Sequence, residues 1–223
     1  MLDELRYAPY ESFLCSFDFC EPSDSEGKSP TENLGQVVFG ERIRPSPYTI
    51  SFGKNSDCQI ACTKKYTASN ADDQKKLAQI RKGMFMNYQH HWIVDNMPVT
   101  WCYPVDNGQR YCSTGFPMGC FVDKQGNPKD ACVISRDYST PDSYYVFNHV
   151  DITIEYHEGK DEDWGKYLKN GNGGRIVSVK IQPRSIKHED GKCNSDVTAG
   201  PLSIKGDGNI DAEISYSYTV TFQ

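Results

Sequence analysis

The stretch NYQHHWIVDNMPVTWCY, residues 87–103, mixes large apolar side chains with polar ones around a single proline. Trp92, Val94 and Trp101 are among the apolar residues, and polar residues are interleaved with them. Pro98 has no backbone donor and drives the residue before it toward extended geometry, so it does not suit a helix. The stretch therefore predicts a strand, a turn and a second strand.

The preceding segment, residues 70–89, has the pattern of one amphipathic helix. Asn70 can cap the first turn, where Asp72 and Asp73 interact favourably with the positive end of the helix dipole. Apolar residues recur at helical spacing, at Leu77, Ile80, Met84 and Tyr88. An apolar stripe along one side of a helix predicts packing against a sheet.

Strand patterns dominate the second half of the chain. Apolar and polar residues alternate along residues 150–156 and 214–222, and residues 176–181 form a third apolar run. Such alternation is typical of antiparallel sheets with one buried face. We therefore predict a mainly all-β fold, an antiparallel β-sandwich with one helix, in a single domain spanning residues 1–223. Residues 1–31 are expected to form an N-terminal tether and a loop.

The nine cysteines of the chain suit an oxidising compartment better than the cytosol. Four of them lie in residues 102–132, a segment rich in Gly, Pro, Asp and Asn, namely Cys102, Cys112, Cys120 and Cys132. We expect this quartet to pair internally and to staple the segment as an insertion into the sandwich. The sequence leaves the pairing open, because four cysteines allow three arrangements. A zinc site is the weaker alternative, since C-x2-C pairs are absent, and no metal or other cofactor is expected.

Charge and hydropathy exclude further classes of protein. The formal net charge is -6, and the basic residues are scattered among acids, which argues against a nucleic-acid partner. No apolar run reaches the ~18 residues that a bilayer span requires, so we expect the chain as given to be soluble. Its start carries acids where a secretion signal carries bases, and we interpret the chain as an excised domain. It contains no N-x-S/T sequon.

No catalytic motif is present: there is no G-x-S-x-G, no phosphate-binding glycine loop and no distinct acid and base carboxylates. His90 and His91 are adjacent on a predicted strand, so they point to opposite faces and cannot easily share a metal ion. His149 and His157 receive the same interpretation as scaffold residues. The acidic residues 161–163 lack the alternate spacing of a calcium loop. We therefore expect a protein without enzymatic activity.

Two other functions remain as alternatives. A carbohydrate-binding module would need aromatic rings exposed together as a stacking platform, and the candidates are Trp92, Trp101, Tyr103, Tyr111 and Trp164. Core packing is the preferred interpretation for those flanked by aliphatic residues. A hydrolase with an unrecognised site would need a cleft that gathers His, Asp and the thiol of Cys15.

Several motifs, in order, resemble the luminal domain of the nonaspanins, the transmembrane nine superfamily, and most of all its member-two branch. Besides residues 87–103 they are FDFC at 17–20, ENLGQVVFGERIRPSPY at 32–48, CxxxC at Cys58 and Cys62, VFNHVDITIEYH at 146–157 and IDAEISYSYTVTF at 210–222. The resemblance implies a luminal domain of a nine-span protein of Golgi and endosomal membranes, whose spans are absent from this chain. It implies help in the sorting and surface delivery of other membrane proteins, and it also suggests a channel or small-molecule transporter.

The resemblance also implies candidate disulfides and partners. Cys20, Cys58, Cys62 and Cys193 resemble a set found in nonaspanins that lack the middle quartet, which leaves Cys15 as the unpaired thiol. The expected partners are membrane-protein clients and the protein's own membrane spans, with a glycan as an open possibility. Contact requires exposure, and the turn-forming sequence of the insertion suggests Asp106, Arg110, Phe116 and Met118 as contact residues.

Overall fold

The computed structural model describes residues 5–8, 17–22, 44–104, 108–129, 132, 134, 136–159, 174–188, 191–193 and 200–223. Strands dominate these residues and a single α-helix accompanies them, so the prediction of a mainly all-β fold is confirmed. The strands form three sheets.

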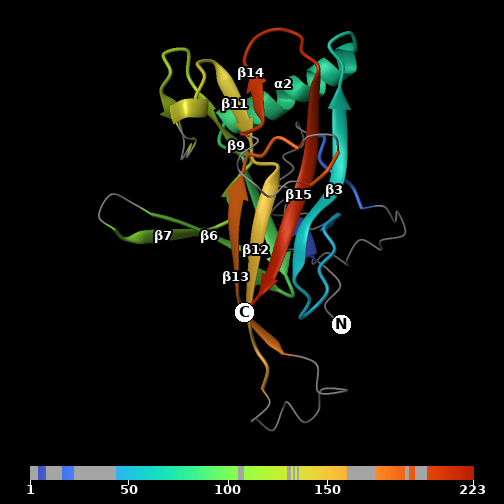
Figure 1. Cartoon of the computed structure of the whole chain (residues 1–223), viewed down its shortest axis with the longest axis vertical. Helices are drawn as coiled ribbons and strands as arrows, with labels where there is room; N and C mark the ends of the chain where they lie inside the picture. The colour runs from blue at the N-terminus through green and yellow to red at the C-terminus, as the bar shows by residue number, and fades with distance from the viewer. Residues whose placement is uncertain are drawn as a thin grey trace, which may run out of the picture.

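A six-stranded sheet runs along the molecule and forms one layer of the sandwich (Figure 1). Its order is β3 (Ser56–Tyr66), β15 (Ala212–Phe222), β12 (His149–His157), β13 (Arg175–Arg184), β6 (Thr100–Pro104) and β7 (Arg110–Thr114). β12 and β15 pair in parallel, as do β13 and β6, whereas the other neighbours are antiparallel. The large sheet is thus mostly antiparallel with two parallel pairs, which the sequence pattern did not reveal, because alternation along a strand reports its buried face and not the direction of its neighbours.

The second layer is a smaller sheet built around strands from residues 87–103. It contains β1 (Leu5–Ala8), β2 (Arg44–Pro45), β4 (Gln89–Val94) and β5 (Met97–Pro98), and β8 (Phe116–Pro117) pairs with the start of β4. Asp95 and Asn96 connect β4 to β5 with φ of 47° and 63°. Two consecutive residues with positive φ are the mark of a tight type I′ hairpin turn, which Asp and Asn tolerate.

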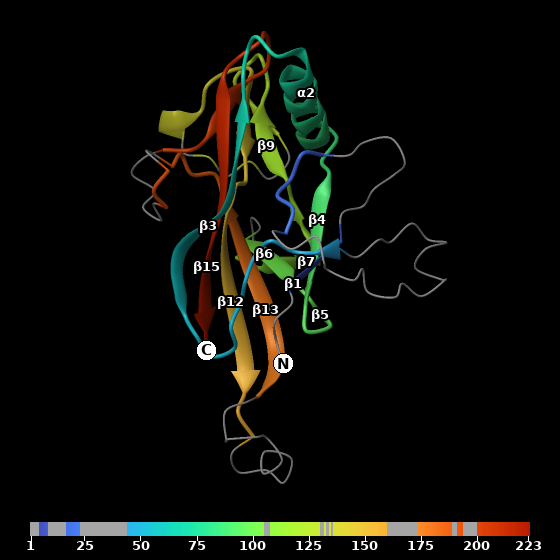
Figure 2. The same ribbon diagram turned by 90° about the vertical axis from the view of Figure 1, so that its right-hand side faces the viewer.

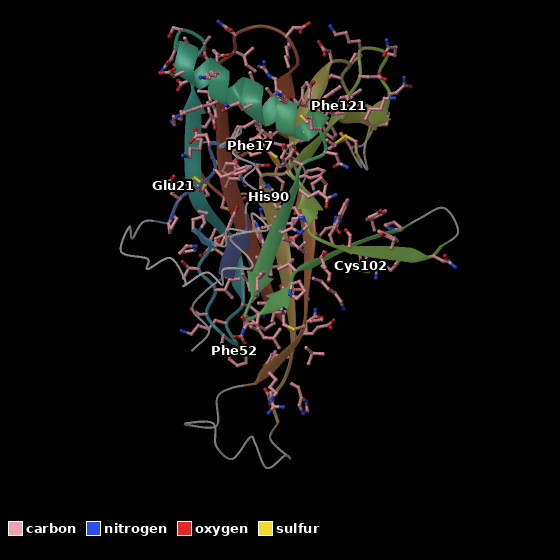
Figure 3. All side chains as sticks on the ribbon, turned by 180° about the vertical axis from the view of Figure 1, so that it is seen from behind. Phe17, Glu21, Phe52, His90, Cys102 and Phe121 are labelled. Atoms are coloured by element: carbon pink, nitrogen blue, oxygen red, sulfur yellow. A yellow bond between two sulfur atoms is a disulfide. The ribbon has the colours of Figure 1, made fainter. Side chains whose placement is uncertain are left out.

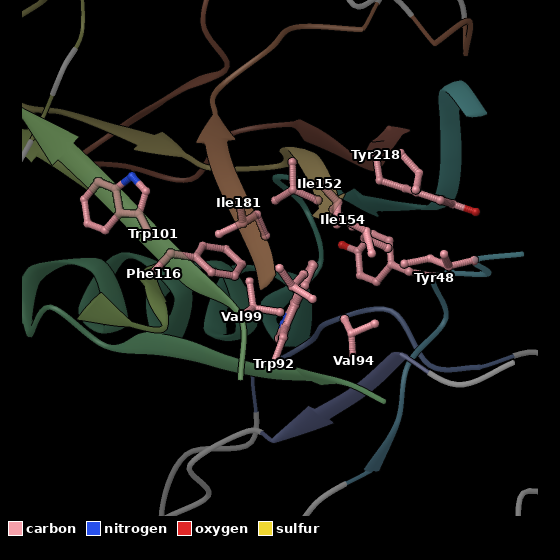
Figure 4. Close-up of a cluster of buried hydrophobic side chains, with 14 residues drawn as sticks. Tyr48, Trp92, Val94, Val99, Trp101, Phe116, Ile152, Ile154, Ile181 and Tyr218 are labelled. Carbon is pink, nitrogen blue, oxygen red and sulfur yellow. The ribbon is translucent and has the colours of Figure 1, made fainter. Parts of the chain in front are cut away.

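The main core fills the space between these two layers (Figures 2 and 4). Trp92 and Val94 of β4 are buried there against residues of the large sheet, including Ile152 of β12 and Ile181 of β13. Each fully buried side chain of this size contributes roughly 1.5–3 kcal/mol through its removal from water. The core thus fixes β4 over the inner face of the large sheet.

The helix α2 spans Ala71–Phe85, with Asn70 as its N-cap. The Asn70 side chain accepts a hydrogen bond of 3.0 Å from the Asp72 backbone N–H. The helix ends earlier than the predicted residue 89, because Asn87 adopts a left-handed conformation, φ 52°, and the Tyr88 N–H donates back to the Gly83 carbonyl at 3.0 Å. The apolar stripe is buried in a second core cluster that contains Leu77, Ile80, Met84, Tyr66, Ile214 and Tyr216.

A third sheet contains β10 (Pro128–Lys129), β9 (Gly119–Val122), β11 (Ser143–Val146) and β14 (Ser203–Lys205), and a 3-10 helix, η1 (Arg136–Tyr138), precedes β11. The segment 102–132 therefore supplies strands to all three sheets instead of forming one insertion. The reason lies in its apolar residues: Phe116, Met118, Cys120 and Val122 alternate along the chain and are buried.

Eight of the nine cysteines form disulfides, which are Cys20–Cys62, Cys58–Cys193, Cys102–Cys112 and Cys120–Cys132. The quartet of residues 102–132 pairs within itself: one bridge joins β6 to β7, and the other joins Cys120 of β9 to Cys132, which lies outside the strands. Cys15 lies outside the described residues.

Candidate functional site

The hairpin of β6 and β7, called the arm below, projects from the side of the molecule (Figure 1). Only Thr100 and Trp101 of β6 pair with β13, so the hairpin continues beyond the edge of the neighbouring strand. Cys102 and Cys112 face each other across the hairpin, with Cα atoms 4.1 Å apart, and their disulfide staples it (Figure 3). An isolated two-stranded hairpin is only marginally stable in water, so the disulfide holds the arm in one register.

The arm carries one of the four suggested contact residues on its surface. Arg110 is exposed at the start of β7. Asp106 lies outside the described residues.

The suggestion of Phe116 and Met118 as contact residues was wrong. Their side chains are 1% and 4% exposed. β8 pairs with β4, which places the Phe116 ring 5.0 Å from that of Trp92, and Met118 packs in the cluster beneath α2. Turn-forming neighbours suggested a surface loop, but this short strand faces the core.

The aromatic residues divide into a buried and an exposed group. Trp92 and Trp101 are buried, which supports core packing and removes two members of the sugar-stacking platform. Tyr103 and Tyr111 lie opposite each other on the arm with ring centroids 5.5 Å apart, and Tyr111 is 56% exposed. Trp164 lies outside the described residues. A carbohydrate platform built on both core tryptophans is therefore excluded.

His90 and His91 point to opposite faces of β4, as predicted. The buried His90 ring lies among aromatic rings, with centroids 4.8 Å from Phe19 and 5.0 Å from Phe116. Burial is the main cause that lowers the pKa of His90 to about 3, and the nearby His91 makes a smaller contribution to this shift. His90 is thus a neutral scaffold residue at physiological pH, whereas His91 is exposed.

A second histidine stands in a polar network that the sequence did not predict. His149 on β12 is fully buried, and its Nδ1 lies 2.8 Å from the Oγ of Ser217 on β15. Its Nε2 lies 3.2 Å from Asp151 Oδ1, and Arg184 on β13 donates to the other oxygen of that carboxylate. The Nε2 of His188 also reaches Ser217 Oγ, at 2.7 Å.

The protons of this network follow from its acceptors. The Asp151 carboxylate only accepts, so His149 Nε2 donates to it, and in the tautomer with its proton on Nε2 the Nδ1 atom accepts from the Ser217 hydroxyl. Ser217 Oγ then accepts from His188 Nε2. Burial alone would raise the pKa of Asp151, but the hydrogen bonds from His149 and Arg184 outweigh it and hold the pKa below its ordinary value. Burial lowers the pKa of His188, and His149 adds to this effect.

Ser217, His149 and Asp151 have the connectivity of a serine-hydrolase triad, so the hydrolase alternative can be judged on geometry. Both Ser217 and His149 are 0% exposed. A nucleophile needs its oxygen within reach of a substrate carbon, and this hydroxyl is enclosed by protein. The arrangement is better suited to joining β12, β15 and the segment after β13 than to acyl transfer.

Asn148, the residue before His149, also joins the start of β12 to β15 and to the segment after β13. Its side-chain Nδ2 donates to the carbonyls of Ile186 and Ser215, both at 2.8 Å, and its Oδ1 accepts from the Ile186 N–H at 2.9 Å. An open groove of about 770 Å³ lies beside this connection and is lined in part by His188, Ser215 and Glu213. His188 therefore stands between the enclosed network and solvent.

Neither a metal site nor a membrane-spanning helix occurs within the described part of the chain. No group of three or more His, Cys, Asp or Glu side chains there could hold a metal ion. No helix there has the length and hydropathy needed to cross a membrane.

Comparison with known proteins gives matches over nearly the whole chain. Residues 9–223 match the family model of Endomembrane protein 70 (EMP70). The chain is 48% identical over 216 residues, 96% of its length, to "Transmembrane 9 superfamily member 2" of Homo sapiens, of which it covers 30%. It is 32% identical over 232 residues to "Transmembrane 9 superfamily member 1" of Saccharomyces cerevisiae, again over 96% of its length and 31% of the relative. The chain thus spans less than a third of the length of these curated relatives, and no solved structure matches it.

Proposed function

Because the chain belongs to the Endomembrane protein 70 family, we propose that it is the lumen-facing, non-catalytic domain of a multi-pass protein of Golgi and endosomal membranes. In this proposal it assists the sorting and surface delivery of other membrane proteins by contacting their ectodomains. Its relatives are named as members of the "Transmembrane 9 superfamily", which supports a membrane setting.

The four disulfides are the observation that carries this proposal. Disulfides form and persist in oxidising compartments and are rare in the cytosol, so they favour the luminal side of the membrane. The domain also presents a stapled arm to solvent, which is the geometry that a contact with another ectodomain requires. The enclosed position of Ser217 supports a role without catalysis.

Orientation can be tested with a glycosylation site placed on the arm. Gln109→Thr in the full-length protein creates an N-x-T sequon at Asn107, in the segment between β6 and β7. A luminal domain should gain one glycan, detected as a mobility shift that an endoglycosidase removes. Gln109→Ala leaves no sequon and should show no shift. A positive control is a sequon that is known to be glycosylated in the lumen. If that control is modified and the Gln109→Thr protein is not, the proposed orientation is wrong.

The sorting role can be tested by proximity labelling in cells. A labelling enzyme on the luminal side of the full-length protein should mark a set of membrane proteins, and deletion of this domain should reduce both their labelling and their amount at the cell surface. As a control, the labelling enzyme is placed on the cytosolic side of the full-length protein and of the deletion variant. This labelling should be equal if the two are expressed at the same level and in the same place. Unchanged labelling and surface delivery after the deletion would overturn the proposal.

A further inference from the structure

The arm has one edge that is open to another strand. β7 is the last strand of the six-stranded sheet and pairs, within the described residues, only with β6. The direction of each backbone group along it follows from the Cα–Cα distance of 4.1 Å between Cys102 and Cys112, which identifies a non-hydrogen-bonded pair.

The hydrogen bond from the Gly115 N–H to the Val99 carbonyl, 3.3 Å, confirms this alternation. Bonded and non-bonded pairs alternate in an antiparallel ladder, so the backbone groups of Tyr111 and Ser113 point toward β6. The N–H and C=O groups of Arg110, Cys112 and Thr114 point away from it. β7 therefore offers three donors and three acceptors in a row.

Other edges carry features that discourage strand addition. On the arm itself, Pro104 of β6 has no N–H, and prolines are a common means of protecting an edge. At the opposite end of the large sheet, β3 carries Lys64 and Lys65 and pairs with β15 through two irregularities. β7 contains no proline, no lysine and no irregularity in its pairing.

We propose that β7 is a docking edge for an extended segment of a client membrane protein, which adds to the sheet as an antiparallel strand. This inference rests on the proposed function, because the client is the occupant. Backbone groups in this geometry are matched only by another strand, which is the mode called β-augmentation. The disulfide keeps the edge preformed, so binding does not have to order it.

The side chains of β7 specify the incoming strand. Arg110 is exposed at one end and favours an acidic residue directly opposite. Tyr111 lies on the other face beside Tyr103, and a β-branched or aromatic residue packs well next to such a ring. A second copy of β7 fits less well, because antiparallel pairing centred on Cys112 places Arg110 opposite Thr114 and offers it no carboxylate.

The test uses a peptide with the core sequence Thr-Val-Thr-Val-Asp, which places Asp opposite Arg110 and a valine opposite Tyr111. Hydrogen exchange of the 223-residue chain is measured residue by residue with and without it. At saturation, exchange at the Arg110, Cys112 and Thr114 amides should slow on the order of ten-fold or more, whereas Tyr111 and Ser113 are already protected by β6.

Two controls separate backbone pairing from non-specific adhesion. The same peptide methylated on the nitrogens of its two threonines and its aspartate has no donors for β7 and should not protect these amides. Thr114→Pro removes an outward N–H without touching the bonds to β6 and should weaken binding, whereas Thr114→Ala keeps that N–H and should bind the peptide as the parent does.

Each result supports or overturns the proposal. Absence of protection at saturating peptide overturns it, as does equal protection by the methylated peptide. Protection that grows with protein concentration in the absence of peptide assigns the edge to a second copy and overturns the client assignment.

Cells distinguish this proposal from the proposed function. In the full-length protein, Arg110→Pro with Thr114→Pro should lower surface delivery of clients, and Arg110→Ala with Thr114→Ala should lower it less. If the proline pair has no effect while deletion of the domain does, the sorting role stands and the docking edge is wrong. If deletion itself has no effect, the sorting role is wrong.

Discussion

At the scale of single residues, two buried histidines show how the same side chain serves two environments. His90 is enclosed by aromatic rings, and His149 is enclosed by hydrogen-bonding partners. Sequence patterns predicted that His90 and His91 diverge, because adjacent residues on a strand face opposite ways. They did not predict the His149 network, since Ser217 lies 68 residues from His149 and is brought to it only by the pairing of β12 with β15.

The buried His90 should make stability depend on pH. Its pKa is about 3 when folded against 6.5 in the ordinary state, so the unfolded chain binds a proton first as the pH falls. The contribution of neutral His90 to the free energy of unfolding is complete above about pH 6.5 and is lost as the pH falls toward about 3. The free energy of unfolding should therefore drop by roughly 3 kcal/mol between about pH 7 and about pH 4.

Denaturant unfolding at several pH values measures this dependence. The difference in unfolding free energy between the two ends of that range should shrink in His90→Gln, even if the variant is less stable throughout. His91→Gln, on the exposed face of the same strand, is the matched control and should keep most of the parental dependence, because burial is the larger cause of the His90 shift. An unchanged slope in His90→Gln would contradict the assignment.

Loss of the bridging hydroxyl should be costly. Ser217→Ala leaves the Nδ1 of a fully buried His149 without its partner, and an unsatisfied buried group costs about 1–3 kcal/mol. Ser203→Ala, an exposed serine on β14, should stay within about 0.5 kcal/mol of the parent. Denaturant unfolding of both variants tests this, and equal stabilities would show that the network contributes little.

At the scale of elements, the helix and three long strands were predictable, whereas β3 and the short strands were not. α2, β12, β13 and β15 each carry a long periodic pattern, which identifies type and buried face. β8 contains two residues, too few for any period, so Phe116 was misread as a loop residue. α2 ends where it does because Asn87 adopts a left-handed conformation. The sequence did not indicate this end, because the helical spacing of apolar residues continues to Tyr88.

The two asparagines at the ends of α2 should differ in their response to substitution. Asn70→Ala removes the acceptor for the Asp72 N–H and should lower the unfolding free energy by about 1 kcal/mol. Asn87→Gly keeps a residue that suits φ 52° and should be neutral or slightly stabilising. Thermal unfolding of the two variants separates these effects. A larger loss in Asn87→Gly than in Asn70→Ala would show that the Asn87 side chain, and not its backbone conformation, matters.

At the scale of the whole molecule, the disulfides differ in what they constrain. Cys58–Cys193 closes a loop of 135 residues, whereas Cys102–Cys112 closes one of 10 residues and lies on the arm. A crosslink that closes a longer loop removes more freedom from the unfolded chain.

Replacing each pair of cysteines by serines should therefore give unequal losses. The chain-entropy relation predicts about 5 kcal/mol for the Cys58 and Cys193 pair and about 3 kcal/mol for the Cys102 and Cys112 pair. The second loss should fall mainly on the arm, where exchange at Tyr111 and Ser113 would accelerate while the core amides stay protected. Equal global losses in the two double variants would show that the arm and the sandwich unfold as one unit.

The position of β15 has a consequence for how this domain is made. The last strand in sequence lies between β3, from the first third of the chain, and β12. Until residues 212–222 have been synthesised, β3 has no neighbour in the large sheet and one side of β12 stays unpaired. Because long-range strand pairing is slow and leaves unpaired strand edges exposed, the growing chain should remain bound to chaperones until translation passes this strand. A ribosome halted before residue 212 should hold a chaperone-bound chain, and one halted far enough beyond residue 223 should release a protease-resistant domain.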